Sequence, residues 1–246
     1  VYVGDSPAEI VQAYVSSTGL PPMMPEYGLG FWQCKLRYWN QEQLLHVARE
    51  YHRRGIPLDV IVCDFFHWPY TGDFRFDTEF FPDPKAMVEE LESMGTKLMC
   101  SIWPQVDRRS ENYQELLKHG LLIRTSKGTN VASLGGDCTF QFIDATNPET
   151  RDYVWEKIKK NYHDLGVELF WLDEAEPEIN AYDADNYRYF DGPALLCANE
   201  YPKCYIQGFY EGMKEQGDEG ICHLIRCAWA GSQKYGALLW SGDVES

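Results

Sequence analysis

A repeated pattern of helix, glycine and apolar strand constrains the fold of this chain more than any other feature of its sequence. Four times, a segment with helical apolar spacing ends at a glycine, and a short apolar strand with a polar or aromatic end follows. The first such unit is the helical pattern at residues 41–54, Gly55 and the strand at 58–63. Alternating helices and strands of this length predict a parallel β-sheet covered by helices.

The number of apolar runs indicates which parallel sheet this is. Six strands are predicted, centred near Leu29, Val60, Leu98, Phe170, Leu224 and Leu238. Helices are predicted at residues 7–14, 41–54, 84–94, 110–119, 148–165 and 193–215. A closed (β/α)₈ barrel needs eight strands. We therefore expect an α/β fold, a (β/α)₈ TIM-type barrel that is truncated with about six βα units present, and the alternative is a six-stranded open sheet.

The two ends of the chain suggest its domain organisation. Residues 1–27 combine a short helical pattern with a proline-rich passage, which is typical of a connector. Residues 28–246 hold the predicted strands, so we expect the barrel to occupy them. No helix follows the last predicted strand, and we therefore expect the barrel to lack its last units.

The composition excludes several classes of partner. With 22 basic and 38 acidic residues, the net charge of −16 argues against nucleic acid and against an anionic membrane surface. No apolar run is long enough to span a membrane and no signal peptide opens the chain, which favours a cytoplasmic location. The eight cysteines form no C-x-x-C pair and the six histidines show no ligand spacing. We expect free thiols, no metal site and no cofactor.

Acidic residues gather where two of the predicted strands end. The strand at 169–172 runs into Asp173, Glu174 and Glu176, and the last strand ends in Trp240-Ser241-Gly242-Asp243. Barrel enzymes keep their catalytic groups at the carboxyl ends of strands. A solvated acidic loop and an ordinary Ser-Gly-Asp turn are the alternatives. Two strand-end aspartates beside tryptophans predict a carboxylate pair that acts on a sugar.

The neighbours of Asp173 are expected to differ in orientation. Because side chains alternate along a strand, Glu174 should point away from the side to which Asp173 points, and we place it outside the site. Glu176 is expected to support the site through hydrogen bonds.

Short motifs follow one another along nearly the whole chain in a distinctive order. They are Gly28-Leu29-Gly30-Phe31-Trp32, Val62-Cys63-Asp64-Phe65-Phe66, Phe80-Phe81-Pro82-Asp83-Pro84, Asp144-Ala145-Thr146-Asn147-Pro148, Trp171-Leu172-Asp173-Glu174-Ala175-Glu176, Arg226-Cys227-Ala228-Trp229-Ala230-Gly231-Ser232-Gln233 and Trp240-Ser241-Gly242-Asp243. Together they resemble the catalytic barrel of glycoside hydrolase family 31, the retaining α-glucosidases and α-xylosidases. The resemblance implies that residues 1–27 connect the barrel to an upstream β-sandwich domain.

The resemblance also implies roles for the strand-end residues. Asp173 would be the nucleophile that forms a glycosyl-enzyme intermediate, and Asp243 would be the acid/base. Retention of configuration requires the two carboxyl groups to lie about 5–5.5 Å apart. Asp64 would bind sugar hydroxyls, unless it caps a helix or pairs in the core. Arg226 would bind the sugar and keep Asp173 ionised, or would neutralise a buried acid.

The aromatic residues bear on the substrate. Trp103, Trp171 and Trp240 are candidate subsite walls, with core packing as the alternative for each. Glucosidases of the family usually carry Ile-Asp where this chain has Phe65-Phe66. Bulk at Phe65 would crowd the C6 hydroxymethyl of a glucoside, worth about 1–3 kcal/mol, and favours a xyloside.

These implications define the expected function. We expect a hydrolase with an α-linked oligosaccharide or xyloside as substrate, most simply an α-xylosidase. An α-glucosidase of the same family and an inactive or carbohydrate-binding fragment are the alternatives. An open barrel would expose strand edges, so a homo-oligomer is a further expectation.

Overall fold

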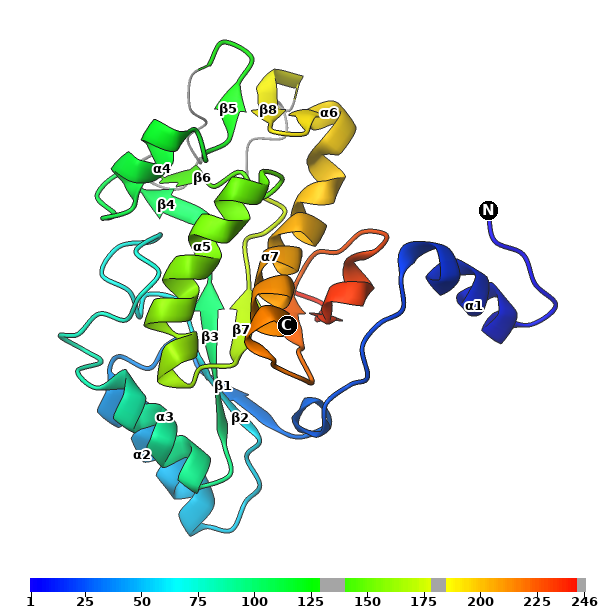
Figure 1. The fold of residues 1–246 in the computed structure, drawn as a ribbon. Helices are drawn as coiled ribbons and strands as arrows, with labels where there is room; N and C mark the ends of the chain where they lie inside the picture. The colour runs from blue at the N-terminus through cyan, green and yellow to red at the C-terminus, as the bar shows by residue number, and fades with distance from the viewer. Residues whose placement is uncertain (129–139, 178–184, 243–246) are drawn as a thin grey trace.

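Six parallel strands form the central sheet of the molecule (Figure 1). The structure is a computed structural model that describes residues 1–128, 140–177 and 185–242. The strand order is β1-β2-β3-β7-β10-β11, which is also their order along the chain. The strands are β1 (Trp32–Cys34), β2 (Val60–Cys63), β3 (Lys97–Ile102), β7 (Leu169–Leu172), β10 (His223–Ile225) and β11 (Ala237–Leu239). The predicted parallel α/β sheet of six strands is confirmed.

Helices connect these strands, and α5 and α7 pack side by side against the sheet (Figure 1). The α-helices are α1 (Pro7–Thr18), α2 (Gln41–Arg53), α3 (Pro84–Ser93), α4 (Tyr113–His119), α5 (Pro148–Asn161), α6 (Ala194–Cys197) and α7 (Tyr201–Gln216). Short 3₁₀ helices are η1 (Glu26–Leu29), η2 (His163–Leu165), η4 (Ala198–Glu200) and η5 (Ser232–Tyr235). Two small antiparallel sheets join β4 (Gln105–Asp107) with β6 (Phe140–Phe142), and β8 (Tyr187–Tyr189) with β5 (Arg124–Thr125) and β9 (Gly192–Pro193).

The helices begin where their capping residues predict. The Asp83 carboxylate accepts a hydrogen bond from the backbone N–H of Ala86 at 3.0 Å, and Pro84 occupies the first helical position of α3. The Asn147 side chain accepts from the backbone N–H of Glu149 at 3.0 Å at the start of α5. These side chains satisfy N–H groups that a helix cannot pair internally.

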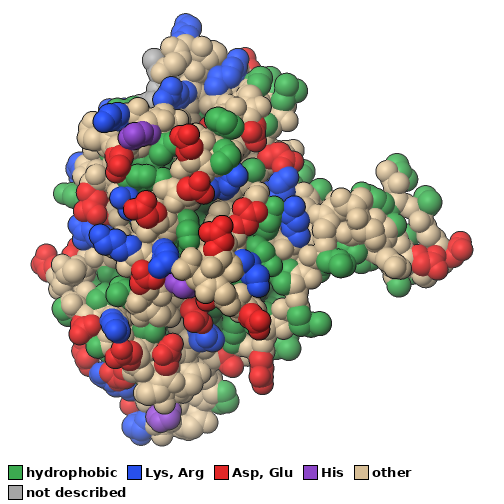
Figure 2. Space-filling view, viewed as in Figure 1, with side chains coloured by type: hydrophobic (Ala, Val, Ile, Leu, Met, Phe, Trp, Pro, Cys, Tyr) green, Lys and Arg blue, Asp and Glu red, His purple; other side chains and the backbone are tan. Residues whose placement is uncertain are grey.

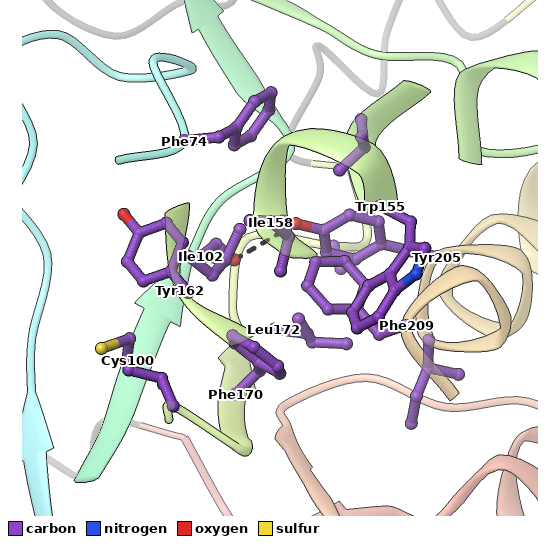
Figure 3. Close-up of a cluster of buried hydrophobic side chains, with 14 of the residues drawn as sticks. Phe74, Cys100, Ile102, Trp155, Ile158, Tyr162, Phe170, Leu172, Tyr205 and Phe209 are labelled. Carbon is purple, nitrogen blue, oxygen red and sulfur yellow. Dashed lines mark hydrogen bonds between the residues drawn. The ribbon is translucent and has the colours of Figure 1, made fainter. Parts of the chain in front are cut away.

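The sheet is buried on both faces, and each face has its own set of side chains. Phe170 and Leu172 pack outward with Trp155 of α5 and Phe209 of α7 (Figure 3). Leu169 and its inward neighbours form a second, smaller apolar cluster with Val60, Val62 and Met99, against which Trp171 and Leu224 pack. Side chains that alternate between two buried faces give near-continuous apolar strands. We call the inward-facing side chains of the strands, such as Val60, Val62, Leu169 and Leu224, the inner row. A polar residue that follows a strand in the same alternation therefore points to the same side of the sheet.

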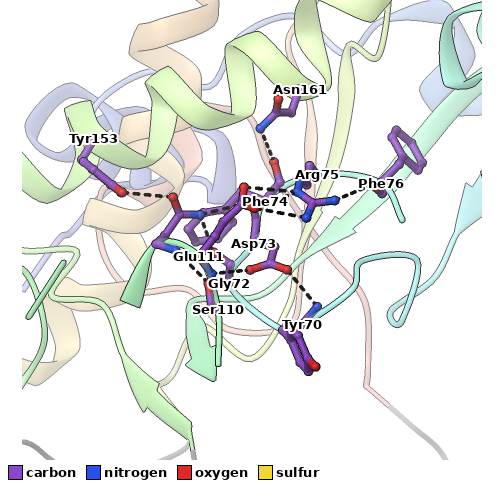
Figure 4. Close-up of polar contacts among 11 residues, drawn as sticks. Tyr70, Gly72, Asp73, Phe74, Arg75, Phe76, Ser110, Glu111, Tyr153 and Asn161 are labelled. Carbon is purple, nitrogen blue, oxygen red and sulfur yellow. Dashed lines mark hydrogen bonds and ion pairs between the residues drawn. The ribbon is translucent and has the colours of Figure 1, made fainter. Parts of the chain in front are cut away.

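A polar network fixes the long loop between β2 and α3 (Figure 4). The buried Asn112 side chain donates to the backbone oxygens of Gly72 and Asp73 at 2.9 and 3.2 Å, and accepts from Tyr153 at 3.0 Å. The Asp73 carboxylate accepts from the backbone N–H of Tyr70 at 3.0 Å. This loop follows Asp64, so the network also fixes the backbone beside the candidate site.

Two predicted elements begin later than expected. The first strand is not at residues 28–32: residues 26–29 form η1, and β1 begins at Trp32. The cause is tertiary, because the Asp59 carboxylate accepts the backbone N–H of Phe31 at 3.0 Å and lies so close to Gly30 that a Cβ there would clash with it. The helix predicted to start at residue 110 is α4, which begins at Tyr113.

The remaining differences concern residues 105–142 and 193–216. The predicted helix at 193–215 is divided into α6, η4 and α7, with Pro202 in the first turn of α7. The segment after α4, for which the sequence predicts no strand, contains β5 and β6. They pair with β8 and β4, and these pairings depend on residues that are distant in the sequence.

The N-terminal segment and the surface complete the description. Helix α1 buries none of its residues and projects from the rest of the molecule (Figure 1), and the predicted domain boundary at residue 28 stays a prediction.

Figure 2 shows acidic and basic side chains interspersed on one face. No described helix is both long and apolar enough to cross a lipid bilayer. The seven cysteines of the described part are free thiols, with Cys34 exposed, Cys227 half-buried and five others buried, and Cys138 lies outside the described residues.

We expect Asn112→Ala to lower the free energy of unfolding by about 2–4 kcal/mol, because it leaves two buried carbonyl oxygens without their donors. Urea denaturation measures this. Arg75→Ala is the matched control, since it removes an ion pair with Glu111 whose side chains are 34% and 52% exposed. Its expected effect is under about 1 kcal/mol, and equal losses in the two variants would contradict the assigned role of Asn112.

Candidate active site

Three polar side chains follow the strands at their carboxyl ends and point to the same side of the sheet as the inward-facing apolar residues. Asp64 follows Val60 and Val62, Asp173 follows Leu169 and Trp171, and Arg226 follows Leu224. Because side chains alternate along a strand, all three continue the row that faces the inside of the sheet. Asp64 and Asp173 are buried, with exposed fractions of 6% and 7%.

Arg226 joins the acidic residues that follow β7. Its Nε and Nη2 donate to the two carboxylate oxygens of Glu176 at 2.8 and 3.0 Å, which is a bidentate ion pair. Its Nε also lies 3.6 Å from Oδ1 of Asp173, and its Nη2 lies 3.1 Å from Oε2 of Glu174. Burial opposes ionisation of Glu176, but the hydrogen bonds from Arg226 hold the pKa of its carboxyl below the usual range. One guanidinium thus faces three carboxylates.

Asp173 has the electrostatic environment of a functional carboxylate. Burial raises its pKa to about 6, although Arg226 acts in the opposite direction. The charges of Glu176 and Asp64 contribute to this rise. Above pH 6 the carboxylate is ionised and poorly solvated, which is the state a nucleophile needs.

Asp64 is held by its own loop. Its Oδ1 accepts the backbone N–H of Phe65 at 2.7 Å, and its backbone oxygen lies 2.9 Å from Nδ1 of His67. The other ring nitrogen of His67 lies 2.9 Å from the hydroxyl of Tyr162. Burial lowers the pKa of His67 to about 4, so the imidazole is neutral at neutral pH and acts as a structural bridge. None of the described helices has Asp64 as its N-cap, which removes one alternative for this residue.

Half-buried aromatic rings lie at the same strand ends. Trp103 packs against Phe65 with ring centroids 4.8 Å apart, and Trp171 meets Trp240 edge to face at 5.3 Å. The indole N–H groups of Trp103 and Trp171 meet no acceptor among the described residues. Phe66 differs from Phe65, because it is 53% exposed and lies in a left-handed conformation with φ of 64°.

The structure corrects one expectation about the site and leaves another untested. Glu174 was expected to point away from the side of Asp173, but both carboxylates reach Arg226. The strand ends at Leu172 and Glu174 has a left-handed φ of 57°, so the alternation of an extended strand no longer applies. Asp243 lies outside the described residues, so its predicted separation from Asp173 stays a prediction.

No group of three or more His, Cys, Asp or Glu side chains is arranged to hold a metal ion in the part of the chain that the structure describes. The chemistry of the described site is instead that of a buried carboxylate beside a guanidinium, with aromatic side chains around it. Such a carboxylate can attack or stabilise an electron-poor carbon.

Comparisons with known proteins agree with this architecture. A model of the glycosyl hydrolases family 31 TIM-barrel domain matches residues 21–246. The solved α-xylosidase from a soil metagenome, complexed with xylose, is 57% identical, with a TM-score of 0.95 over 99% of this chain and 36% of that one. The match confirms the TIM-barrel class over the alternative of an unrelated open sheet.

Two curated relatives extend the comparison. An uncharacterized family 31 glucosidase from Pseudescherichia vulneris is 53% identical over 247 residues, covering 100% of this chain and 46% of the relative. An α-xylosidase from Saccharolobus solfataricus is 35% identical over 259 residues, covering 99% of this chain and 32% of the relative. The chain thus spans less than half the length of the relatives it matches.

We expect Asp173→Asn to raise the free energy of unfolding by about 2 kcal/mol more at pH 7.5 than at pH 4.5. In the folded chain the carboxyl has a pKa of about 6, and in the unfolded chain it ionises near its ordinary value of 3.8. The native state therefore binds more protons between these values, and stability falls as the pH rises through that window. The uncharged amide removes this penalty.

Urea denaturation at the two pH values measures the effect. Asp164→Asn is the control, because this carboxylate is 49% exposed and pairs with Lys159 at the surface. An Asp173→Asn effect of the same size at both pH values would mean that the carboxyl does not titrate in this window.

Proposed function

The chain belongs to glycoside hydrolase family 31, and on that premise we propose that its site serves a retaining α-glycoside hydrolase that acts on α-xylosides. The observation that supports this most is the buried Asp173 carboxylate, which follows the inner row of β7 and lies 3.6 Å from Arg226. The relatives support a glycosidase of this family, and the finer assignment is our proposal.

The proposed reaction is a double displacement. The Asp173 carboxylate attacks the anomeric carbon, the bond to the leaving oxygen breaks, and a glycosyl-enzyme intermediate forms. Asp243 is proposed to protonate that oxygen and then to take a proton from the water that releases the sugar. The transition state carries positive charge on the sugar, and the carboxylates around Arg226 outnumber the guanidinium that faces them. Their negative charge stabilises such a transition state.

The other side chains are proposed to bind the sugar. Asp64 accepts hydrogen bonds from sugar hydroxyls, and Arg226 orients the acidic residues. Trp103, Trp171 and Trp240 form walls against the sugar ring.

The preference for a xyloside rests on Phe65. This ring packs on Trp103 beside Asp64 and narrows the space at the strand ends. Two of the relatives named above are α-xylosidases. The relative from Pseudescherichia vulneris is named a glucosidase, so an α-glucosidase is the second candidate. A carbohydrate-binding protein without turnover is the candidate from another class.

We expect the full product of the gene that encodes this chain to hydrolyse p-nitrophenyl α-xyloside faster than p-nitrophenyl α-glucoside. Asp173→Asn should reduce kcat by several orders of magnitude, because it removes the nucleophile. Full activity in Asp173→Asn would overturn the mechanism. Sugar binding without turnover, unchanged in this variant, would support the binding protein.

We expect Phe65→Ala to shift the ratio of kcat/KM for the glucoside over the xyloside upward by about 10- to 100-fold, which corresponds to about 1–3 kcal/mol. Opening space beside Trp103 would admit the C6 hydroxymethyl group. Phe66→Ala is the matched control, since this ring is largely exposed. A ratio that Phe65→Ala leaves unchanged would contradict the steric explanation of specificity.

A further inference from the structure

Glu174 occupies an unusual backbone conformation beside the candidate nucleophile. Its φ of 57° lies in the left-handed region, which non-glycine residues adopt infrequently and at a cost in free energy. The residue is buried, with an exposed fraction of 9%. A long acidic side chain gains nothing by itself from this conformation or from burial. The surroundings must therefore fix both, and the ion pair with Arg226 is one of the contacts that do so.

The contact determines how the guanidinium is turned. Nη2 of Arg226 lies 3.1 Å from Glu174 and 3.0 Å from the nearer oxygen of Glu176. Nε lies 2.8 Å from the other oxygen of Glu176 and 3.6 Å from Asp173. Glu176 alone could hold the fork of the guanidinium while its plane tilts about the two hydrogen bonds. The charge of a second carboxylate, 3.1 Å from Nη2, opposes that tilt.

We propose that Glu174 is a positioning residue for the candidate nucleophile, because its carboxylate forms an ion pair with the Nη2 end of Arg226 and so keeps the guanidinium charge beside Asp173. This inference rests on the proposed function, in which Asp173 attacks the sugar. In this role the Glu174 side chain touches neither the sugar nor the reacting atoms, whereas its backbone N–H donates a hydrogen bond to the Asp173 carboxylate. Its charge also draws on the same guanidinium that would otherwise stabilise ionised Asp173.

Several other charged or titratable groups act on Asp173, and the test must leave them in place. They are Arg226 and Cys227 after β10, Glu176 after β7, Asp64 after β2 and Tyr205 of α7. Glu174→Gln keeps the size and an oxygen acceptor of the side chain but removes its charge. Glu174→Ala removes both the charge and the contact with Nη2.

The first experiment measures kcat, KM and their pH dependence in the full gene product. We expect Glu174→Ala to lower kcat about 10- to 100-fold with KM changed less than threefold, because a small misplacement of reacting groups slows the chemical step. Glu174→Gln should restore kcat to within about fivefold of the unchanged protein. In this variant, the pH at which kcat falls on the acidic side of its pH profile should be lower by about half a pH unit, because one negative charge near Asp173 has been removed. An unchanged kcat per folded molecule in Glu174→Ala would overturn the proposal.

A second experiment separates this proposal from the proposed function, because it needs no turnover. The increase in the free energy of unfolding caused by Asp173→Asn is measured as a function of pH, once in the unchanged chain and once in a chain that carries Glu174→Gln. We expect the pH at which this increase is half complete to be lower by about half a pH unit in the Glu174→Gln chain. If the midpoint shifts but the protein has no glycosidase activity, the proposed function is refuted and the coupling between Glu174 and Asp173 is supported. Identical midpoints would refute the coupling of Glu174 to Asp173.

Discussion

Burial of the parallel sheet on both faces is the constraint on which the rest of the structure depends. Outward side chains such as Phe170 pack under α5 and α7, and inward ones such as Leu169 form the smaller inner cluster. Strand pairing fixes the register, so that Ser101 lies beside Trp171 and Trp171 beside Leu224. Because the register is fixed, the residues that follow the strands arrive at one edge of the sheet in one orientation. The acidic site is a consequence of this geometry.

The site gathers negative charge that the fold does not favour. Burial raises the pKa of Asp173 to about 6 even with Arg226 beside it, so the ionised carboxylate destabilises the native state at neutral pH. A single guanidinium shared by Asp173, Glu174 and Glu176 cannot compensate all of them. Such uncompensated charge is typical of sites that stabilise a cationic transition state.

The same fold assigns different tasks to neighbouring residues. Phe65 packs on Trp103 near the site, whereas Phe66, one residue later, is largely exposed. His67 is buried and neutral between Asp64 and Tyr162, and it fixes the loop rather than taking part in proton transfer. Family membership gives the chemistry that this site is expected to perform, and these contacts give its local form.

The sequence by itself determined the α/β class, the six parallel strands, the helix starts at Pro84 and Pro148, and the strand-end positions of Asp64, Asp173 and Arg226. These depend on local periodicity and on the alternation of side chains, which neighbouring residues encode. Only the tertiary structure decided that β1 starts at Trp32, where Asp59 holds the preceding backbone. It also decided that Glu174 turns back to Arg226, because a left-handed residue interrupts the alternation and its partner lies about fifty residues away in the chain. Contacts between such distant residues depend on the packing of the whole sheet, which no local pattern contains.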